Sequence, residues 1–153
     1  MEIADLLVPR GVVPQLRISN KKAALQELAR RAAAMTGLPE RRIHDTLTER
    51  ERLGSTGIGR GIAIPHGKFA ELTRPYGLFA RLERPIVFDA IDNQPVDLVF
   101  VLLAPESGAL HLRALARVSR LLRDAAICQK LRGTDKAEAL YALLTSTSES
   151  HAA

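Results

Sequence analysis

The chain has 153 residues, of which 46% are hydrophobic and 25% are charged, a balance that is typical of a globular protein and excludes a disordered chain. Its net charge of +5 would suit nucleic acid, but aromatic residues make up only 4%, and the sequence has no base-stacking motif and no Cys/His finger, so we expect no nucleic-acid partner. Cys128, the single cysteine, excludes an internal disulfide, and its apolar helical pattern predicts a buried thiol.

Length and composition predict one domain over residues 1–145, followed by a disordered polar tail over 146–153. The longest apolar run, 98–104, is far below the roughly 18 residues that a membrane-spanning helix requires. The N-terminal stretch is acidic, whereas a secretory leader begins with basic residues. We therefore expect a cytoplasmic protein with no membrane insertion.

Two helices are predicted in the first third of the chain. Ser19 or Asn20 can cap the first, in which apolar residues recur at spacings of three and four until Gly37 ends it. Pro39 opens the second, which has one apolar face and runs into Arg50. A helix end is therefore expected to deliver Arg50 to the segment that follows.

Short apolar runs in the middle of the chain predict strands. Residues 62–64, 76–82 and 85–88 are strand candidates, and residues 92–95 have the composition of a turn. Val96 and residues 98–103 are apolar on both faces, which predicts a buried central strand. Helices and strands alternate along the chain, so the expected fold is α/β, with a mixed β-sheet flanked by helices on both faces.

The last third of the chain is predicted to be helical. Ser107 can cap a long helix with an apolar inner face, and Gly133 and Thr134 separate it from a last amphipathic helix. The other face of the long helix carries a row of arginines, which we interpret as a solvated surface rather than a docking site. These arginines are Arg113, Arg117, Arg120 and Arg123.

The segment 54–68, GSTGIGRGIAIPHGK, contains five of the ten glycines in the chain, and a backbone with so few side chains can approach a bulky anion closely. Within it, His66 can supply a neutral, nucleophilic nitrogen. The cations nearest to it in sequence are Arg50, Arg60 and Lys68. This combination indicates a phosphoryl group as substrate, whereas the structural alternative is a turn histidine beside a flexible loop.

Known nucleotide-binding loops do not fit this segment. A P-loop ending at residues 67–68 requires Gly at position 62 and Ser or Thr at position 69, but the chain has Ile62 and Phe69 there. The glycine spacing also departs from the dinucleotide fingerprint. No His-Glu-x-x-His pattern or carboxylate cluster is present, so we expect no cofactor and no metal.

Three stretches of the sequence together resemble one protein family. They are the glycine-rich run at 54–68, FDAIDNQPVDLVFVLLAP at 88–105, and the pair His111-Leu112 that opens the next helix. In this order they are similar to the nitrogen-regulatory IIA proteins of the bacterial phosphotransferase system, which belong to the fructose/mannitol-type IIA superfamily. The resemblance extends from Ile3 to Leu144 and implies that residues 1–145 form a single EIIA type-2 domain.

The resemblance implies that His66 accepts a phosphoryl group through its Nε2 atom. The family's Arg-Glu-x-x-Gly-Ser-Thr run falls on residues 50–56, which implies that Arg50 supports the phosphate, and His111 matches the second histidine of the active centre. His111, near a helix start, is expected to donate a hydrogen bond or to fix the tautomer of His66. The further residues expected to bind the phosphate are Ser55, Thr56, Gly67, Lys68 and Arg60.

Among these residues, Arg60 departs from the family, because relatives often carry Asn or Glu at this place. If its guanidinium reaches the site, we expect it to strengthen phosphate binding. Comparing the phosphotransfer equilibrium of the native protein with that of Arg60→Asn tests this hypothesis.

The resemblance further implies an HPr-like phosphocarrier protein (NPr) as phosphoryl donor, and regulatory targets such as sensor kinases or potassium-transport components. Transfer between two imidazoles is nearly balanced in energy, so the relay is expected to be metal-independent. With no permease domain attached, we expect a regulatory output rather than sugar uptake. Two alternatives stay open: a non-phosphorylated binding module that docks a kinase or transporter subunit, and a metal hydrolase that uses His66 and His111.

Overall fold

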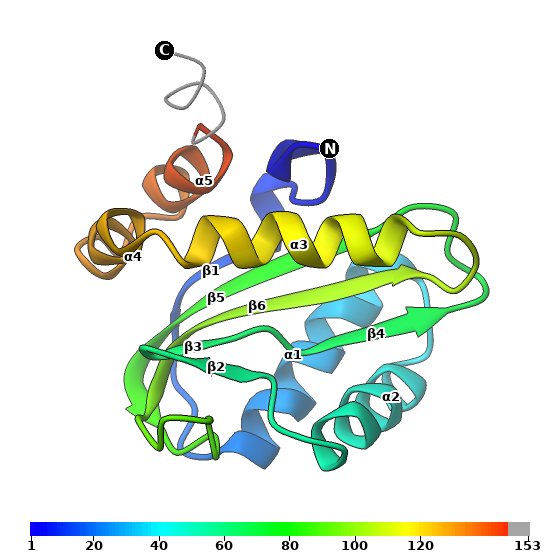
Figure 1. Ribbon diagram of the computed structural model, residues 1–153, viewed down its shortest axis with the longest axis horizontal. Helices are drawn as coiled ribbons and strands as arrows, with labels where there is room; N and C mark the ends of the chain where they lie inside the picture. The colour runs from blue at the N-terminus through cyan, green and yellow to red at the C-terminus, as the bar shows by residue number, and fades with distance from the viewer. Residues whose placement is uncertain (147–153) are drawn as a thin grey trace.

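The structure, a computed structural model, describes residues 1–146, so all but the first residue of the predicted tail lie outside the described residues. Its centre is a six-stranded sheet (Figure 1). The strands are β1 Val12–Leu16, β2 Gly57–Gly59, β3 Ile62–Ala63, β4 His66–Phe69, β5 Tyr76–Ile86 and β6 Val96–Pro105. The helices are α1 Lys21–Thr36, α2 Glu40–Arg52, α3 Leu110–Leu122, α4 Ala125–Arg132 and α5 Ala137–Thr145, and two short 3-10 turns, η1 Ile3–Asp5 and η2 Pro9–Gly11, precede β1.

The sheet is mixed, as the alternation of helices and strands predicts. Its strand order is β1-β5-β6-β3-β2, and β4 pairs with β6 as well. The neighbours β5 and β6 are antiparallel, whereas β1 is parallel to β5 and both β3 and β4 are parallel to β6. One long strand, β6, therefore holds β3 and β4 in line along the same edge.

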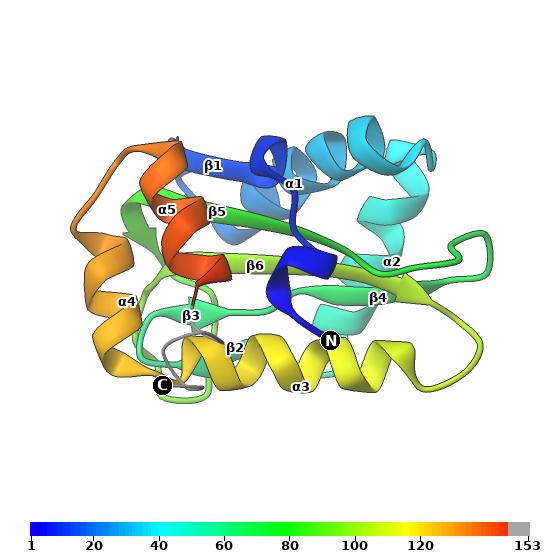
Figure 2. The same cartoon turned by 90° about the horizontal axis from the view of Figure 1, so that it is seen from above.

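Both faces of the sheet are covered by helices, which confirms the predicted fold class (Figure 1). Side chains of β6 alternate between two apolar cores. Val99 and Val101 belong to the core that includes α1 and α2, whereas Leu98 and Phe100 belong to the core that includes α3, α4 and α5. Figure 2 shows this face of the sheet from above, with α5 over β1 and β5 and with α3 near the other edge, beside β2 and β3.

The helix predicted after residue 20 is confirmed as α1, because both of its ends have local causes. The Oδ1 atom of Asn20 accepts a hydrogen bond of 2.8 Å from the backbone N–H of Ala23 and so caps the first turn. Gly37 has a φ of 80°, a left-handed conformation that glycine adopts without strain. The helix predicted to run into Arg50 is also confirmed, as α2.

Four strands differ from the sequence-based expectation. β2, within the glycine-rich segment, was not predicted. β1 was not predicted, because Pro14 weakens the strand pattern, but β1 lies at the edge of the sheet, where proline is tolerated. β4 was not predicted either, since only one of its four residues is fully buried. The two candidates at 76–82 and 85–88 form one strand, β5, which ends at Ile86 and whose register with β6 shifts between Arg81 and Ile86.

Two helix predictions in the last third are wrong. Ser107 does not cap the long helix, because α3 begins at Leu110 with Ala109 in the cap position and without a side-chain cap. The predicted long helix is broken at Asp124, whose carboxylate caps α4. The row of arginines is exposed at three positions, but only 13% of the side chain of Arg117 is exposed, and its guanidinium lies 3.7 Å from the carboxylate of Glu2.

The topology brings three parts of the chain together at one end of β6. His66, the first residue of β4, pairs with Leu102 of β6. The chain leaves β6 at Pro105 and enters α3 at Leu110, so His111 lies near the same end of the sheet. Among the described residues, no helix has the length and hydropathy that a membrane span requires.

Candidate functional site

A cavity of about 750 Å³ lies where α2, β4, the end of β6 and the start of α3 meet. The structure brings five of the predicted site residues together in its wall, namely Arg50, His66, Gly67, Lys68 and His111. The remaining lining residues are Asp45, Thr46, Glu49, Leu53, Leu102, Ala104, Glu106, Leu112 and Leu115. The fold therefore brings Arg50 and His111, which are 61 positions apart in the sequence, to the same open site.

His66 is half-buried, and one of its two ring nitrogens is already engaged. Its Nδ1 atom lies 2.7 Å from the backbone carbonyl oxygen of Ile64. Because a carbonyl oxygen can only accept, Nδ1 must carry the proton and donate it. In the neutral ring, Nε2 is then the atom with the free electron pair, so the local backbone selects Nε2 as the nucleophile.

The pKa of His66 is lowered from its ordinary value of 6.5. The main cause is burial, which disfavours the charged ring, and the electrostatic effects of Arg50 and His111 act in the same direction. The hydrogen bond to Ile64 and the negative charge of Glu51 oppose this shift but do not cancel it. At neutral pH the ring is therefore uncharged and able to act as a nucleophile.

We expect an NMR titration of the folded protein to give His66 a midpoint below 6.5, whereas the same ring in the urea-unfolded chain titrates near 6.5. Since the unfolded state takes up the proton first, the free energy of unfolding should fall as the pH drops through 6.5 towards the folded midpoint. A folded midpoint at or above that of the unfolded chain would contradict the lowered pKa.

Arg50 reaches the cavity from the last turn of α2. Its Nη1 atom donates a hydrogen bond of 2.8 Å to the backbone carbonyl of Gly54, just beyond the end of the helix. This contact fixes one side of the guanidinium and leaves other N–H groups for an anion in the cavity. A positively charged side chain at the C-terminal end of a helix is also favoured by the helix dipole.

His111 lies in the first turn of α3. Its Nδ1 atom is buried and has no hydrogen-bond partner among the described residues. The ring of His111 as a whole lines the cavity. The ring therefore provides a second imidazole beside His66.

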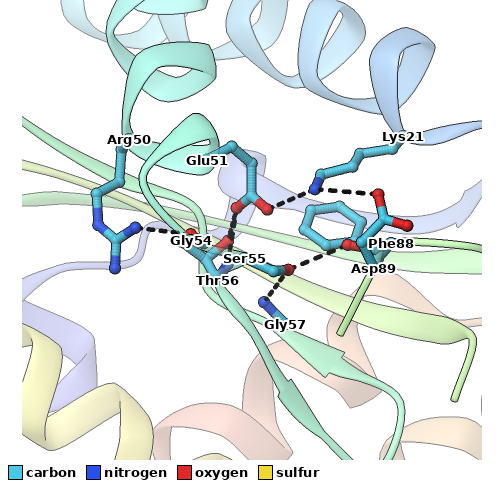
Figure 3. Close-up of polar contacts among 9 residues, drawn as sticks. All are labelled: Lys21, Arg50, Glu51, Gly54, Ser55, Thr56, Gly57, Phe88 and Asp89. Atoms are coloured by element: carbon cyan, nitrogen blue, oxygen red, sulfur yellow. Dashed lines mark hydrogen bonds and ion pairs between the residues drawn. The ribbon is translucent and has the colours of Figure 1, made fainter. Parts of the chain in front are cut away.

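Ser55 and Thr56, which were predicted to bind the phosphate, do not line the cavity, and their side chains are bonded within the loop region that Figure 3 shows. The hydroxyl of Ser55 donates to the carbonyl of Phe88 and accepts from the N–H of Gly57, each at 3.0 Å. Thr56 is buried, and both its N–H and its hydroxyl are bonded to the carboxylate of Glu51. These side chains hold the loop in place, and their hydroxyls do not face the site.

Arg60 also lies outside the cavity, in the turn between β2 and β3, and the structure does not bring it together with His66. Its backbone has a φ of 56°, its N–H donates to Asp92 at 2.9 Å, and its carbonyl accepts from Arg132 at 2.8 Å. The side chain lines a separate hollow next to the end of α3. This placement gives no support for a role of Arg60 in phosphate binding.

The rim of the cavity contains residues that the sequence analysis did not single out. Leu53 and Leu112 are 78% and 60% exposed, so two large apolar side chains of the cavity wall face solvent. Three carboxylates, from Asp45, Glu49 and Glu106, also line the cavity. Two of these carboxylates could have been predicted from the sequence. Asp45 and Glu49 are four residues apart on α2, so they lie on the same face of the helix that carries Arg50.

Comparison with known proteins identifies the family of the chain. A family model described as EIIA 2 of the phosphoenolpyruvate-dependent sugar phosphotransferase system matches residues 5–147. A nitrogen regulatory protein of Bradyrhizobium diazoefficiens is 55% identical over 145 residues, which cover 94% of this chain and 95% of that protein. The nitrogen regulatory protein of Escherichia coli K12 is 47% identical over 149 residues, which cover 96% of this chain and 91% of that protein.

Two solved structures have the same fold. The crystal structure of the nitrogen regulatory protein IIA-Ntr from Neisseria meningitidis matches with a TM-score of 0.88 and 34% identity, covering 94% of this chain and 99% of that one. The IIA mannitol protein of Escherichia coli matches with a TM-score of 0.75 and 19% identity, covering 90% and 98%, and this likeness concerns the fold alone. The chain therefore belongs to the EIIA type-2 family of the phosphoenolpyruvate-dependent sugar phosphotransferase system and is similar to its nitrogen-regulatory members.

Proposed function

We propose that the chain is a phosphohistidine phosphocarrier in which Nε2 of His66 accepts a phosphoryl group from an HPr-like carrier protein (NPr). The observation that carries this proposal is the 2.7 Å contact between Nδ1 of His66 and the carbonyl of Ile64. This contact leaves Nε2 unprotonated in a ring that lines an open cavity, together with a guanidinium and a second imidazole. Members of the EIIA family act as phosphotransfer components, which supports the same role here.

In the transfer, the P–N bond of the donor's phosphohistidine breaks while a bond forms between phosphorus and Nε2 of His66. The donor ring leaves with the electron pair of the broken bond. The ring of His66 keeps its Nδ1 proton and shares its new positive charge with the Ile64 carbonyl. Arg50 and Lys68 supply positive charge for the phosphoryl oxygens, and His111 can donate a hydrogen bond to one of them. We expect this step to require no metal.

The output that we propose is regulatory. Phosphorylation adds about 1.5 to 2 negative charges to the cavity, between the exposed leucines Leu53 and Leu112 and beside the carboxylates of the rim. The same surface then favours different partners in the two states. The relatives named nitrogen regulatory proteins support a regulatory output over sugar uptake. As targets we propose sensor kinases or potassium-transport components, and a cytoplasmic location fits these partners.

The test is incubation of the protein with the phosphorylated HPr-like carrier. We expect a phosphate on the wild type that is lost in acid and retained in alkali, and NMR of the labelled ring should place it on Nε2. His66→Ala should carry no label, whereas His44→Ala, which alters a histidine outside the cavity, should be labelled like the wild type. A wild-type protein that takes no label from the carrier would leave only a docking role and would overturn the proposal.

A further inference from the structure

Two charged residues behind the site lie at helix ends where the helix dipole disfavours them. Lys21 is the first residue of α1, a position that favours a negative charge, and α1 has no acidic residue in its first turn. Glu51 is the next-to-last residue of α2, where a positive charge is favoured. Each charge is therefore unfavourable in its own helix, and contacts with other elements must offset this cost.

The two residues form an ion pair with each other (Figure 3). The Nζ atom of Lys21 lies 2.6 Å from Oε2 of Glu51, 3.7 Å from a carboxylate oxygen of Asp89, and 4.8 Å from the centre of the Phe88 ring. Glu51 is only 8% exposed. Burial by itself would raise the pKa of Glu51, but Lys21 and Thr56 outweigh it, so the pKa is lowered and the carboxylate stays charged.

The other oxygen of Glu51 holds the loop that follows α2. It accepts a hydrogen bond of 2.9 Å from the backbone N–H of Thr56, and it also accepts the hydroxyl of this residue. Next to it, Ser55 fastens the loop to the carbonyl of Phe88 at 3.0 Å. Glu51 therefore joins the start of α1 to the loop 54–57.

This loop in turn holds a residue of the site. The carbonyl of Gly54, two residues before Thr56, accepts the hydrogen bond from Arg50. Gly54 has a φ of 152°, and its exposed backbone is fixed on one side by the end of α2 and on the other by Ser55 and Thr56. Movement of the loop would move the Gly54 carbonyl and release the Arg50 guanidinium.

We propose that the ion pair between Lys21 and Glu51 is a positioning element of the site, which fixes Arg50 through the loop 54–57. This inference rests on the proposed phosphoryl transfer. A purely stabilising role explains the pair poorly, because a buried ion pair contributes little more to stability than well-packed apolar side chains of the same volume. A defined geometry at Arg50, in contrast, requires a directional contact.

The first test compares Lys21→Met with Lys22→Met, a matched control at the neighbouring exposed lysine. With the phosphorylated HPr-like carrier as donor, we expect Lys21→Met to lower the maximum transfer rate at least about tenfold. The half-saturating donor concentration should not change, because the rim of the cavity is untouched. Lys21→Arg should retain most of the rate and Lys22→Met all of it. A Lys21→Met rate within twofold of the wild type, measured well below the unfolding temperature, would overturn the proposal.

A second variant covers the case in which the unpaired Glu51 prevents Lys21→Met from folding. The double variant Lys21→Met/Glu51→Gln leaves no buried charge unpaired and should fold, yet its transfer should be slowed to a similar extent. Transfer at the wild-type rate in this variant would equally overturn the inference.

A readout without any donor separates this inference from the proposed function. The negative charge of Glu51 raises the pKa of His66, so in Glu51→Gln the NMR midpoint of His66 should be lower than in the wild type. If the wild type accepts no phosphoryl group, the proposed function fails while this titration still tests the placement of Glu51. An unchanged midpoint in Glu51→Gln would show that the pair does not act on His66.

Discussion

Phosphoryl transfer to His66 is expected to slow by about two orders of magnitude when Arg50 is replaced by Gln. Arg50 is a cation of the cavity wall that the Gly54 carbonyl holds at 2.8 Å, so its remaining N–H groups are oriented before the phosphoryl group arrives. Gln keeps a hydrogen-bond donor but loses the charge and the forked geometry that suits phosphoryl oxygens. Single-turnover labelling from the phosphorylated HPr-like carrier measures the effect.

Arg52→Gln is the matched control for this experiment. Arg52 ends the same helix, but it is exposed, pairs with Glu49 at 2.9 Å and does not line the cavity. Its replacement should leave the transfer rate within about twofold of the wild type, because exposed ion pairs contribute little. Equal rates for Arg50→Gln and the wild type would show that the guanidinium does not contact the phosphoryl group in the transition state.

The parts of the fold that could be predicted are those with local causes. α1 is specified by the side chain of Asn20 at one end and the left-handed Gly37 at the other, and both signals can be read without knowledge of the tertiary structure. β6 is similarly clear, because a strand with two apolar faces must be covered on both sides. The fold class follows from these elements and their alternation with the remaining helices.

Two of the strands that were not predicted, β4 and β1, depend on partners far away in the sequence. β4 reads His-Gly-Lys-Phe, which has little strand character, and it exists because its backbone pairs with residues 102–105 of β6. β1 contains Pro14, and it is stabilised as an edge strand by pairing with β5. For such short segments, the tertiary pairing outweighs the local propensity.

For the site, the residue types were easier to predict than their orientations. The motif resemblance selected His66, Arg50 and His111, and these three do share one cavity. It could not show that the hydroxyl of Thr56 turns towards Glu51, because two neighbouring hydroxyls in a glycine-rich loop look equally available in a sequence. Lys21, which lies 45 positions before His66, gave no signal except its unfavourable place at the start of α1.

Replacing Gly67 with Ala is expected to destabilise the protein by about 1–3 kcal/mol, because the site leaves no room for a side chain there. A Cβ atom at position 67 would lie 2.7 Å from Cγ2 of Thr46 on α2 and 3.3 Å from the ring of Phe69. A helix restricts χ1 of the β-branched Thr46, so we expect α2 to shift away from β4. Urea unfolding of Gly67→Ala and the wild type measures the loss.

The same shift should reduce phosphoryl transfer, because Arg50 follows Thr46 by one helical turn and would move with it. A displacement of about 1 Å at a positioning group can cost about a hundredfold in rate. The double variant Gly67→Ala/Thr46→Ala removes the clashing Cγ2 atom and should recover most of the stability and of the rate, whereas Thr46→Ala alone should have little effect on either. If the double variant is no better than Gly67→Ala, the contact between β4 and α2 is not what requires glycine beside His66.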